Sequence, residues 1–255
     1  MKIWTNTKTL DGYDEGLDFT SSKTDAHIAL MGSKSMNILD FPNLKGIFRA
    51  GVGRDNVPMD VAHDKGIIVR FPSQKTIDFI FEETANFTCS LIFQMLYSDV
   101  GEIESWSKKP RFRFDSKELL VIGCGNIGSR VSQKMSNFLQ VNTFDIISSK
   151  KNSLESLIQS ADCITLHIPY NSDNDGFFDS EKLSLMKDNS VLINTARGKI
   201  VDENSLLAEI KTKRIRAAFD VYWEEPYHGS LKLHHPNYFF MTPHVASTCS
   251  DFLEG

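Results

Sequence analysis

Cysteine is scarce in this 255-residue chain, and its positions exclude several classes of protein. The four cysteines are Cys89, Cys124, Cys163 and Cys249. Their scattered spacing fits neither a disulfide framework nor a paired metal-ligand motif, so we expect reduced thiols. The neighbouring His234 and His235 do not suggest a metal either, because adjacent side chains in an extended segment point apart. The sequence therefore predicts no metal site.

Long apolar runs and an excess of positive charge are also missing. No stretch approaches the roughly 20 apolar residues of a membrane-spanning helix, and the start, Met-Lys-Ile-Trp-Thr-Asn, has no apolar signal region. The formal net charge of −5 gives no general attraction to nucleic acid or anionic lipid. The hydrophobic content of 41% is ordinary for a globular protein. We expect a cytoplasmic protein that binds neither nucleic acid nor a membrane.

Short apolar runs alternate with longer helical patterns, which favours an α/β architecture with parallel strands. In the first part we expect strands at 2–5, 26–31, 46–49 and 67–71, and helices at 60–65 and 83–97. A polar stretch over 105–117 indicates a crossing between two domains. In the second part we expect strands at 119–122, 141–145, 163–167, 191–194, 217–220 and 239–241, and helices at 127–138, 153–160 and 203–211.

The most informative segment runs Leu-Leu-Val-Ile-Gly-Cys-Gly-Asn-Ile-Gly over residues 119–128. The four apolar residues predict a buried parallel strand, and the glycines predict a tight turn into a helix. Gly123 would permit the turn, Gly125 would let a pyrophosphate approach the backbone, and Gly128 would let helix and strand pack closely. The N-terminal end of that helix would then hold phosphate charge.

An acidic residue at the end of the next apolar run strengthens this interpretation. Asp145 lies 22 positions after Gly123, where a carboxylate accepts hydrogen bonds from an adenosine ribose. The same carboxylate repels the additional phosphate of NADP. The sequence therefore predicts a dinucleotide site that prefers NAD.

Three polar residues follow late apolar runs of the second part. Arg197 follows Val-Leu-Ile-Asn-Thr-Ala, Glu225 precedes a proline, and His244 lies in Met-Thr-Pro-His-Val-Ala-Ser. These are the residue types that reduction of a 2-keto acid requires. A planar guanidinium would clamp the carboxylate and the keto oxygen, an imidazole would give that oxygen a proton, and a carboxylate would orient the imidazole.

Each of the three also has an ordinary structural interpretation. An arginine after a strand is commonly solvated or salt-bridged, a Pro-His pair commonly forms a turn, and Glu-Glu-Pro commonly ends a helix or loop. Their joint occurrence after a dinucleotide signature favours function.

Four segments resemble the D-isomer-specific 2-hydroxyacid dehydrogenases: Gly-Cys-Gly-Asn-Ile-Gly, Asn-Thr-Ala-Arg-Gly, Asp-Val-Tyr-Trp-Glu-Glu-Pro and Thr-Pro-His-Val-Ala. The resemblance, which includes the phosphoglycerate dehydrogenases of that family, implies a two-domain α/β protein. A smaller flavodoxin-like substrate domain would span 1–98, a Rossmann-type NAD-binding domain 99–245, and a short C-terminal remnant 246–255. It also implies an oxidoreductase that transfers a hydride between NAD and a D-2-hydroxy acid or 2-keto acid, with Arg197, Glu225 and His244 as catalytic residues.

The same resemblance assigns binding residues. NAD would be held by Gly123, Gly125, Asn126, Ile127, Gly128, Asp145, His167, Pro169, Thr195, Ala196, Asp220 and His244. His167 and Pro169 belong to the adenine-side loop, and Asp220 would meet the nicotinamide amide. The main-chain N–H groups of Val52 and Gly53, together with Arg197, would hold the substrate. Lys34 would either reach an anionic tail of the substrate or be a solvated loop lysine.

The chain also departs from the family pattern. Only 11 residues follow His244, and the stretch before the dinucleotide strand is compressed, which puts domain closure and the usual dimer arm in doubt. Relatives usually dimerise, so we expect a homodimer. Two other interpretations stay open: an NAD(H)-sensing protein resembling the C-terminal binding proteins, which are corepressors, and a truncated, inactive paralogue. The substrate stays open among phosphoglycerate-like, hydroxypyruvate or glyoxylate, and lactate-like acids.

Overall fold

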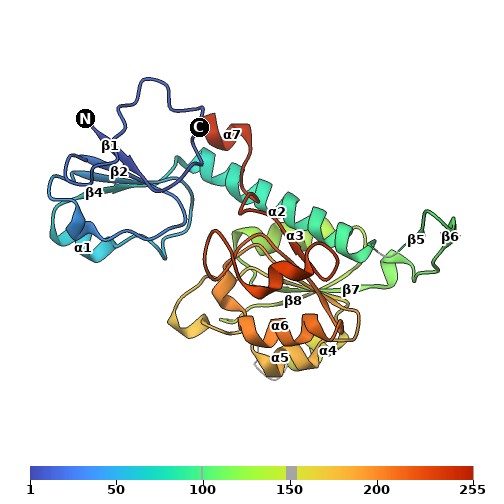
Figure 1. Ribbon diagram of the computed structural model, residues 1–255. Helices are drawn as coiled ribbons and strands as arrows, with labels where there is room; N and C mark the ends of the chain where they lie inside the picture. Colours follow the sequence, from blue (N-terminus) through green and yellow to red (C-terminus); the bar gives the residue numbers. More distant parts are fainter. Residues whose placement is uncertain (99, 148–153, 255) are drawn as a thin grey trace. The chain divides into compact units, whose positions relative to one another are not determined.

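The computed structural model describes residues 1–98, 100–147 and 154–254, which form two compact units (Figure 1). Unit 1 comprises Met1–Phe81 and the residues from Ser247 on, and unit 2 comprises Glu82–Ala246. The expected division at residue 98 follows helix α2 (Gln74–Leu96), whereas the compact units divide inside that helix. The C-terminal half of α2 groups with unit 2 because its apolar residues pack against strands there.

Unit 1 contains a parallel sheet of four strands. These are β1 (Ile3–Thr5), β2 (Ile28–Met31), β3 (Gly46–Arg49) and β4 (Ile68–Arg70), which pair in that order. Phe19 forms a parallel bridge with Ile3 on the free side of β1, so the extended segments, counted along the chain, lie in the order 2-1-3-4-5. That is the strand order of flavodoxin, as expected from the sequence. Helix α1 (Met59–Asp64) packs Ala62 into the core of this unit.

Unit 2 is built on six parallel strands. They are β7 (Glu118–Ile122), β8 (Gln140–Phe144), β9 (Cys163–Leu166), β10 (Val191–Asn194), β11 (Arg216–Phe219) and β12 (Phe239–Met241). Their order in the sheet is β12-β11-β10-β9-β7-β8. From β7 the chain first adds β8 on one side and then β9 on the other, so β7 and β9 border a topological switch point.

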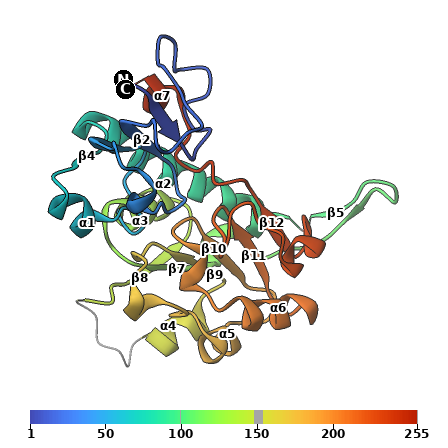
Figure 2. The same cartoon turned by 60° about the vertical axis from the view of Figure 1, so that its left-hand side comes forward.

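Helices cover both faces of this sheet (Figure 2). Helices α2 and α3 (Asn126–Met135) pack on one face, and α4 (Leu154–Ser160), α5 (Ser180–Leu185) and α6 (Glu203–Lys211) pack on the other. Strands β9 and β10 are buried at every position. Burial on both faces explains why these strands appear in the sequence as uninterrupted apolar runs.

Two regions differ from the sequence expectation. Helix α2 begins at Gln74 rather than near residue 83, because the Ser73 hydroxyl accepts a hydrogen bond from the Thr76 N–H and caps the helix. The polar stretch at 105–117 contributes to a hairpin of β5 (Gly101–Glu102) and β6 (Ser107–Lys108), which projects from the rest of unit 2 in both views.

Residue 153, the expected start of α4, lies outside the described residues.

Several short helices were not among the expected elements. Helices α5 and α7 (Ser250–Glu254) have six and five residues, too few to show a periodic apolar pattern. The described residues include the 3-10 helices η1 (Ile38–Asp40), η2 (Phe114–Ser116), η4 (Ser172–Asn174), η5 (Gly198–Ile200) and η6 (Ser230–His234).

Candidate active site

The turn after β7 has a backbone that only glycine accommodates. Gly123 has φ +96, and a Cβ there would lie 2.6 Å from the main-chain carbonyl carbon of His167, which follows β9. A Cβ on Gly128 would lie 1.9 Å from the Gly123 oxygen. Two of the three predicted glycines are therefore required by contacts within the protein.

The third glycine faces open space. Gly125 is the N-cap of α3, makes no side-chain cap, is exposed, and has no heavy atom within 4 Å of an added Cβ. The first N–H groups of a helix lack intrahelical acceptors and carry the positive end of the helix dipole. The turn from Gly123 to Gly128, including the predicted Asn126 and Ile127, therefore fits a bound pyrophosphate.

Asp145 follows β8 beside this turn. Its carboxylate accepts hydrogen bonds from the main-chain N–H groups of Cys124 and Ile147, each at 3.0 Å. The contact with Cys124 ties the acidic residue to the glycine turn. The side chain is only partly buried, so the carboxylate is positioned next to the turn and remains accessible to a ribose.

His167 and Pro169 follow β9 on the other side of the switch point. The His167 Nε2 atom lies 3.0 Å from the Thr165 hydroxyl, and burial lowers the pKa of His167 to about 3. The imidazole is therefore neutral at physiological pH. Pro169 is exposed, and its carbonyl accepts a hydrogen bond from the buried Asn174 amide at 2.9 Å.

The predicted Thr195 and Ala196 follow β10. The Thr195 hydroxyl lies 2.8 Å from the hydroxyl of Thr88 on α2. Thr88 donates its hydrogen to the Thr84 carbonyl, so Thr195 is the donor of this pair. The Ala196 N–H donates to the Asn194 side chain at 3.0 Å. These contacts fix the loop that leads to Arg197.

The structure brings Glu225 and His244 into direct contact. The Nδ1 atom of His244 lies 2.9 Å from each carboxylate oxygen of Glu225, although the residues are 19 positions apart. Both side chains are mostly buried, with relative exposures of 30% for the histidine and 21% for the glutamate. A two-oxygen acceptor at Nδ1 fixes the ring orientation and leaves Nε2 as the atom for a further partner.

Arg197 lies at the same edge of the sheet, after β10, which is the neighbour of β11. Its carbonyl accepts a hydrogen bond from the Asn194 side chain, and its Nη1 atom donates to the Ala196 carbonyl at 2.7 Å. The next residue, Gly198, packs tightly on the peptide between Tyr222 and Trp223. The arginine loop is thus packed against the segment that leads to Glu225.

Asp220 is fully buried at the end of β11. Its Oδ1 accepts from the Thr242 hydroxyl at 2.5 Å and from the Val245 N–H at 2.9 Å, and its Oδ2 accepts from the Ala246 N–H at 2.8 Å. Burial raises the pKa of Asp220, and these three hydrogen bonds oppose that rise. The sequence suggested only a nicotinamide contact for this residue.

The remaining predicted residues belong to unit 1. Val52 and Gly53 follow β3, and Lys34 is an exposed residue after β2, so all three lie at the carboxyl ends of parallel strands. The amides of Asn6 and Asn56 both donate to the Lys34 carbonyl, which fixes this loop.

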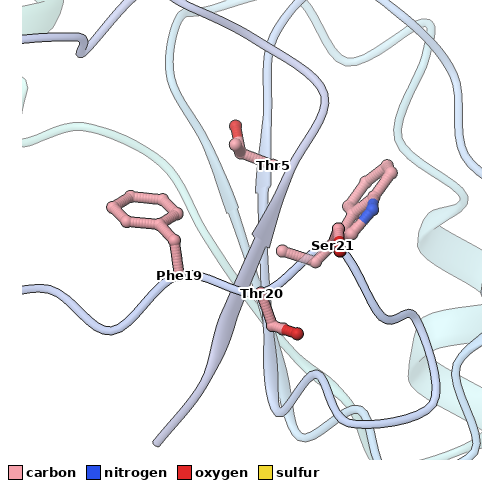
Figure 3. A pocket seen from close by; sticks show the side chains of 5 residues that line it. Thr5, Phe19, Thr20 and Ser21 are labelled. Atoms are coloured by element: carbon pink, nitrogen blue, oxygen red, sulfur yellow. The ribbon is translucent and has the colours of Figure 1, made fainter.

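An open pocket in unit 1 is unrelated to these residues. It lies beside β1 and is lined by Trp4, Thr5, Phe19, Thr20 and Ser21, none of which is titratable (Figure 3). Among the described residues, no group of three or more His, Cys, Asp or Glu side chains is arranged to hold a metal ion. No helix in the described part of the chain has both the length and the apolar character needed to cross a membrane.

Comparison with known proteins identifies the family. Residues 100–246 match the model of the D-isomer specific 2-hydroxyacid dehydrogenase, NAD binding domain. The chain belongs to this family. This confirms the resemblance found in the sequence and the prediction of an NAD-binding domain.

Curated relatives in this family have two activities in their names. A D-3-phosphoglycerate dehydrogenase of Bacillus subtilis is 30% identical over 224 residues, which is 82% of this chain and 42% of that protein. A hydroxypyruvate reductase of Thermotoga maritima is 29% identical over 225 residues, covering 82% and 72%. The chain spans about two fifths of the length of the phosphoglycerate dehydrogenases that it matches.

A solved structure of a dehydrogenase shares the fold. The D-lactate dehydrogenase from Aquifex aeolicus, complexed with NAD and lactic acid, matches with a TM-score of 0.78 at 23% identity. The match covers 100% of this chain and 91% of that chain. It confirms the predicted α/β fold.

Proposed function

We propose that the protein is an NAD-dependent oxidoreductase that interconverts a 2-keto acid and the corresponding D-2-hydroxy acid. The observation that carries the proposal is the contact of His244 with Glu225 at the carboxyl edge of a sheet whose switch point fits a dinucleotide. Family membership supports the same reaction. The names of the relatives favour a phosphoglycerate-like acid or hydroxypyruvate as substrate.

In this proposal, unit 2 holds the cofactor. The turn from Gly123 to Gly128 binds the pyrophosphate through main-chain N–H groups, and Asp145 accepts hydrogen bonds from the adenosine ribose. The loops that carry His167, Pro169, Thr195 and Ala196 line the remainder of the cofactor site. When bound, the nicotinamide supplies or accepts the hydride at the substrate carbon.

His244 is the proposed acid and base of the reaction. With Nδ1 directed to Glu225, its Nε2 gives a proton to the keto oxygen during reduction and removes it from the hydroxyl during oxidation. Glu225 orients the ring and stabilises the imidazolium form. The guanidinium of Arg197 binds the substrate carboxylate and the keto oxygen, which places charge where the oxygen becomes negative.

Unit 1 supplies further substrate-binding groups in this proposal. The main-chain N–H groups of Val52 and Gly53 hold the substrate carboxylate, and the exposed ammonium of Lys34 attracts a second anionic group. A phosphorylated substrate would gain the most from Lys34.

The test is NADH oxidation with a panel of keto acids: 3-phosphohydroxypyruvate, hydroxypyruvate, glyoxylate and pyruvate. We expect saturable turnover with at least one acid and a loss of at least 100-fold in kcat for His244→Asn. The control variant is His63→Asn, because His63 is exposed and lies next to Asp64 rather than Glu225. Tight NADH binding without turnover of any acid would support the sensor alternative, and weak NADH binding would support an inactive paralogue.

We also propose that the protein is a cytoplasmic homodimer. Its four cysteines are free thiols, as suits a reducing compartment. The hairpin in unit 2 and the segment that follows it expose Ile103, Trp106 and Phe112 by about four fifths of their surface, and such side chains are commonly covered by a partner. Light scattering should give a dimer for the wild type and a monomer for Trp106→Ser with Phe112→Ser. Leu233→Ser, at another exposed apolar residue of unit 2, should stay dimeric.

A further inference from the structure

Thr242 links His244 to three residues around β11. Its N–H donates to the Phe219 carbonyl at 3.1 Å, and its hydroxyl donates to Asp220 at 2.5 Å. Its carbonyl accepts a hydrogen bond from the His244 N–H at 3.1 Å and lies 2.8 Å from the Tyr222 hydroxyl, which is equally close to the Phe219 carbonyl. The N–H, carbonyl and hydroxyl groups of Thr242 therefore all make hydrogen bonds, and Thr242 lies two residues before His244, the proposed acid and base.

The backbone at His244 needs such support. Its φ is +56, in the left-handed region that non-glycine residues rarely adopt. A backbone of this kind persists only where surrounding contacts hold it. Here the contacts are the Thr242 carbonyl before the residue and Asp220, which binds the N–H groups of Val245 and Ala246 after it.

The same region also fixes Glu225. The Tyr222 N–H donates to Glu225 Oε1 at 3.3 Å, and the Tyr222 hydroxyl shares its one hydrogen between the carbonyls of Thr242 and Phe219. Burial raises the pKa of the Tyr222 phenol, so the hydroxyl keeps its proton and remains a donor. Both members of the His244–Glu225 pair are thus anchored to the end of β11.

We propose that Thr242 is a positioning residue for His244: its hydroxyl, bound to buried Asp220, holds the left-handed turn that directs the imidazole at Glu225. The inference rests on the proposed function for its catalytic consequence. Removing the hydroxyl leaves the buried Oδ1 of Asp220 with one donor fewer. It also removes a contact that holds the turn at His244. Because a misplacement of about 1 Å costs roughly 100-fold in rate, turnover should fall while cofactor binding persists.

The kinetic test compares two substitutions that differ only in the hydroxyl group. Thr242→Val keeps the shape of the side chain without the hydroxyl, and Thr242→Ser keeps the hydroxyl. We expect kcat to fall 10- to 100-fold in Thr242→Val with KM for NADH within about threefold of wild type, and Thr242→Ser to stay within threefold in both. Thr212→Val, which removes an exposed hydroxyl bound to the Glu209 carbonyl, is the matched control and should behave as wild type. Wild-type kcat in Thr242→Val, or equal losses in the valine and serine variants, would overturn the proposal.

A second measurement does not depend on turnover. In ¹⁵N–¹H NMR of the histidine side chains, His244 Nδ1 should carry the hydrogen directed to Glu225 in the wild type and in Thr242→Ser. In Thr242→Val the His244 resonances should shift or broaden while those of His63 remain unchanged. If the wild type reduces no keto acid but the NMR pattern holds, the proposed function fails and the positioning role stands. Unchanged His244 resonances in Thr242→Val refute the positioning role.

A second variant, Tyr222→Phe, tests the proposal if Thr242→Val does not fold. Tyr222→Phe removes the hydroxyl that contacts the carbonyls of Thr242 and Phe219, and it keeps the ring that stacks on Tyr227. It should lower kcat by about threefold to tenfold and shift the same His244 resonances. Wild-type kcat and unshifted His244 resonances in this variant would also reject the proposal.

Discussion

The main-chain carbonyl group of His167 occupies the space where a side chain on Gly123 would lie. A Cβ built on Gly123 is 2.6 Å from the His167 carbonyl carbon and oxygen. The contact lies at the switch point, because Gly123 follows β7 and His167 follows the adjacent β9. Gly123 is therefore required by the folded structure itself, whereas Gly125, which faces open space, is required only if a ligand approaches the turn.

Gly123→Ala and Gly125→Ala should therefore fail in different ways. Alanine at position 123 meets both a left-handed φ of +96 and the His167 backbone, so we expect the free energy of unfolding to fall by about 2–4 kcal/mol. Alanine at position 125 has an ordinary φ of −72 and open space, so stability should change by less than about 1 kcal/mol. The Kd for NADH should rise at least tenfold in Gly125→Ala, because the added methyl group occupies the approach to the turn. Urea unfolding and fluorescence titration measure the two quantities. Equal stability losses would contradict this assignment.

The imidazole of His167 should make stability depend on pH. Its pKa is about 3 in the folded protein, against an ordinary value near 6.5. Between these values the unfolded chain binds a proton that the folded chain does not bind, so the free energy of unfolding rises with pH across this window. The contribution is at most about 1.4 kcal/mol per pH unit. His167→Asn should remove it, and urea unfolding of both proteins from pH 4.5 to 7 gives the difference. Parallel stability curves for the two proteins would show that His167 titrates normally.

Asp145 should determine the choice between the two nicotinamide cofactors. Asp145→Asn keeps an acceptor for the Cys124 N–H but removes the negative charge that repels an additional phosphate. We expect the ratio of the Kd for NADPH to the Kd for NADH to fall at least tenfold. Asp188→Asn, at an exposed aspartate near Arg214, removes one charge elsewhere in unit 2 and should leave the ratio unchanged. If both substitutions have the same effect, net charge alone governs cofactor choice.

The elements that the sequence predicted best include short apolar strands bounded by turns. Strands β3, β10 and β12 have the expected bounds because short apolar runs between turns leave few alternatives. The start of α2 was harder, since Ile77, Phe79 and Phe81 alternate with other residues as in a strand, and only the Ser73 cap marks the helix.

The candidate site was predictable where a motif carried it and not where distant residues meet. Glu225 and His244 were recognisable because each is an ionisable residue that follows a predicted strand. Their contact follows from the neighbouring positions of β11 and β12. The three bonds of Asp220 were not visible, because they depend on how the segment from Thr242 to Ala246 folds back over β11. A hydroxyl residue two positions before the histidine was the available signal.

The charge of Glu225, rather than its size, should govern turnover. Glu225→Gln keeps the length of the side chain and an acceptor for His244 Nδ1, but it removes the negative charge beside that nitrogen. Since the imidazolium is the proton donor during reduction, we expect kcat to fall roughly 10- to 1,000-fold with little change in KM for the keto acid. The neighbouring Glu224 is exposed and makes Glu224→Gln a control with the same chemical change one residue away. Steady-state kinetics of both variants, with thermal unfolding as a check on the fold, separates the two roles. If the two glutamine variants share the same kcat, the Glu225 carboxylate only packs against the ring, and the proton has to come from a histidine held in place by other contacts.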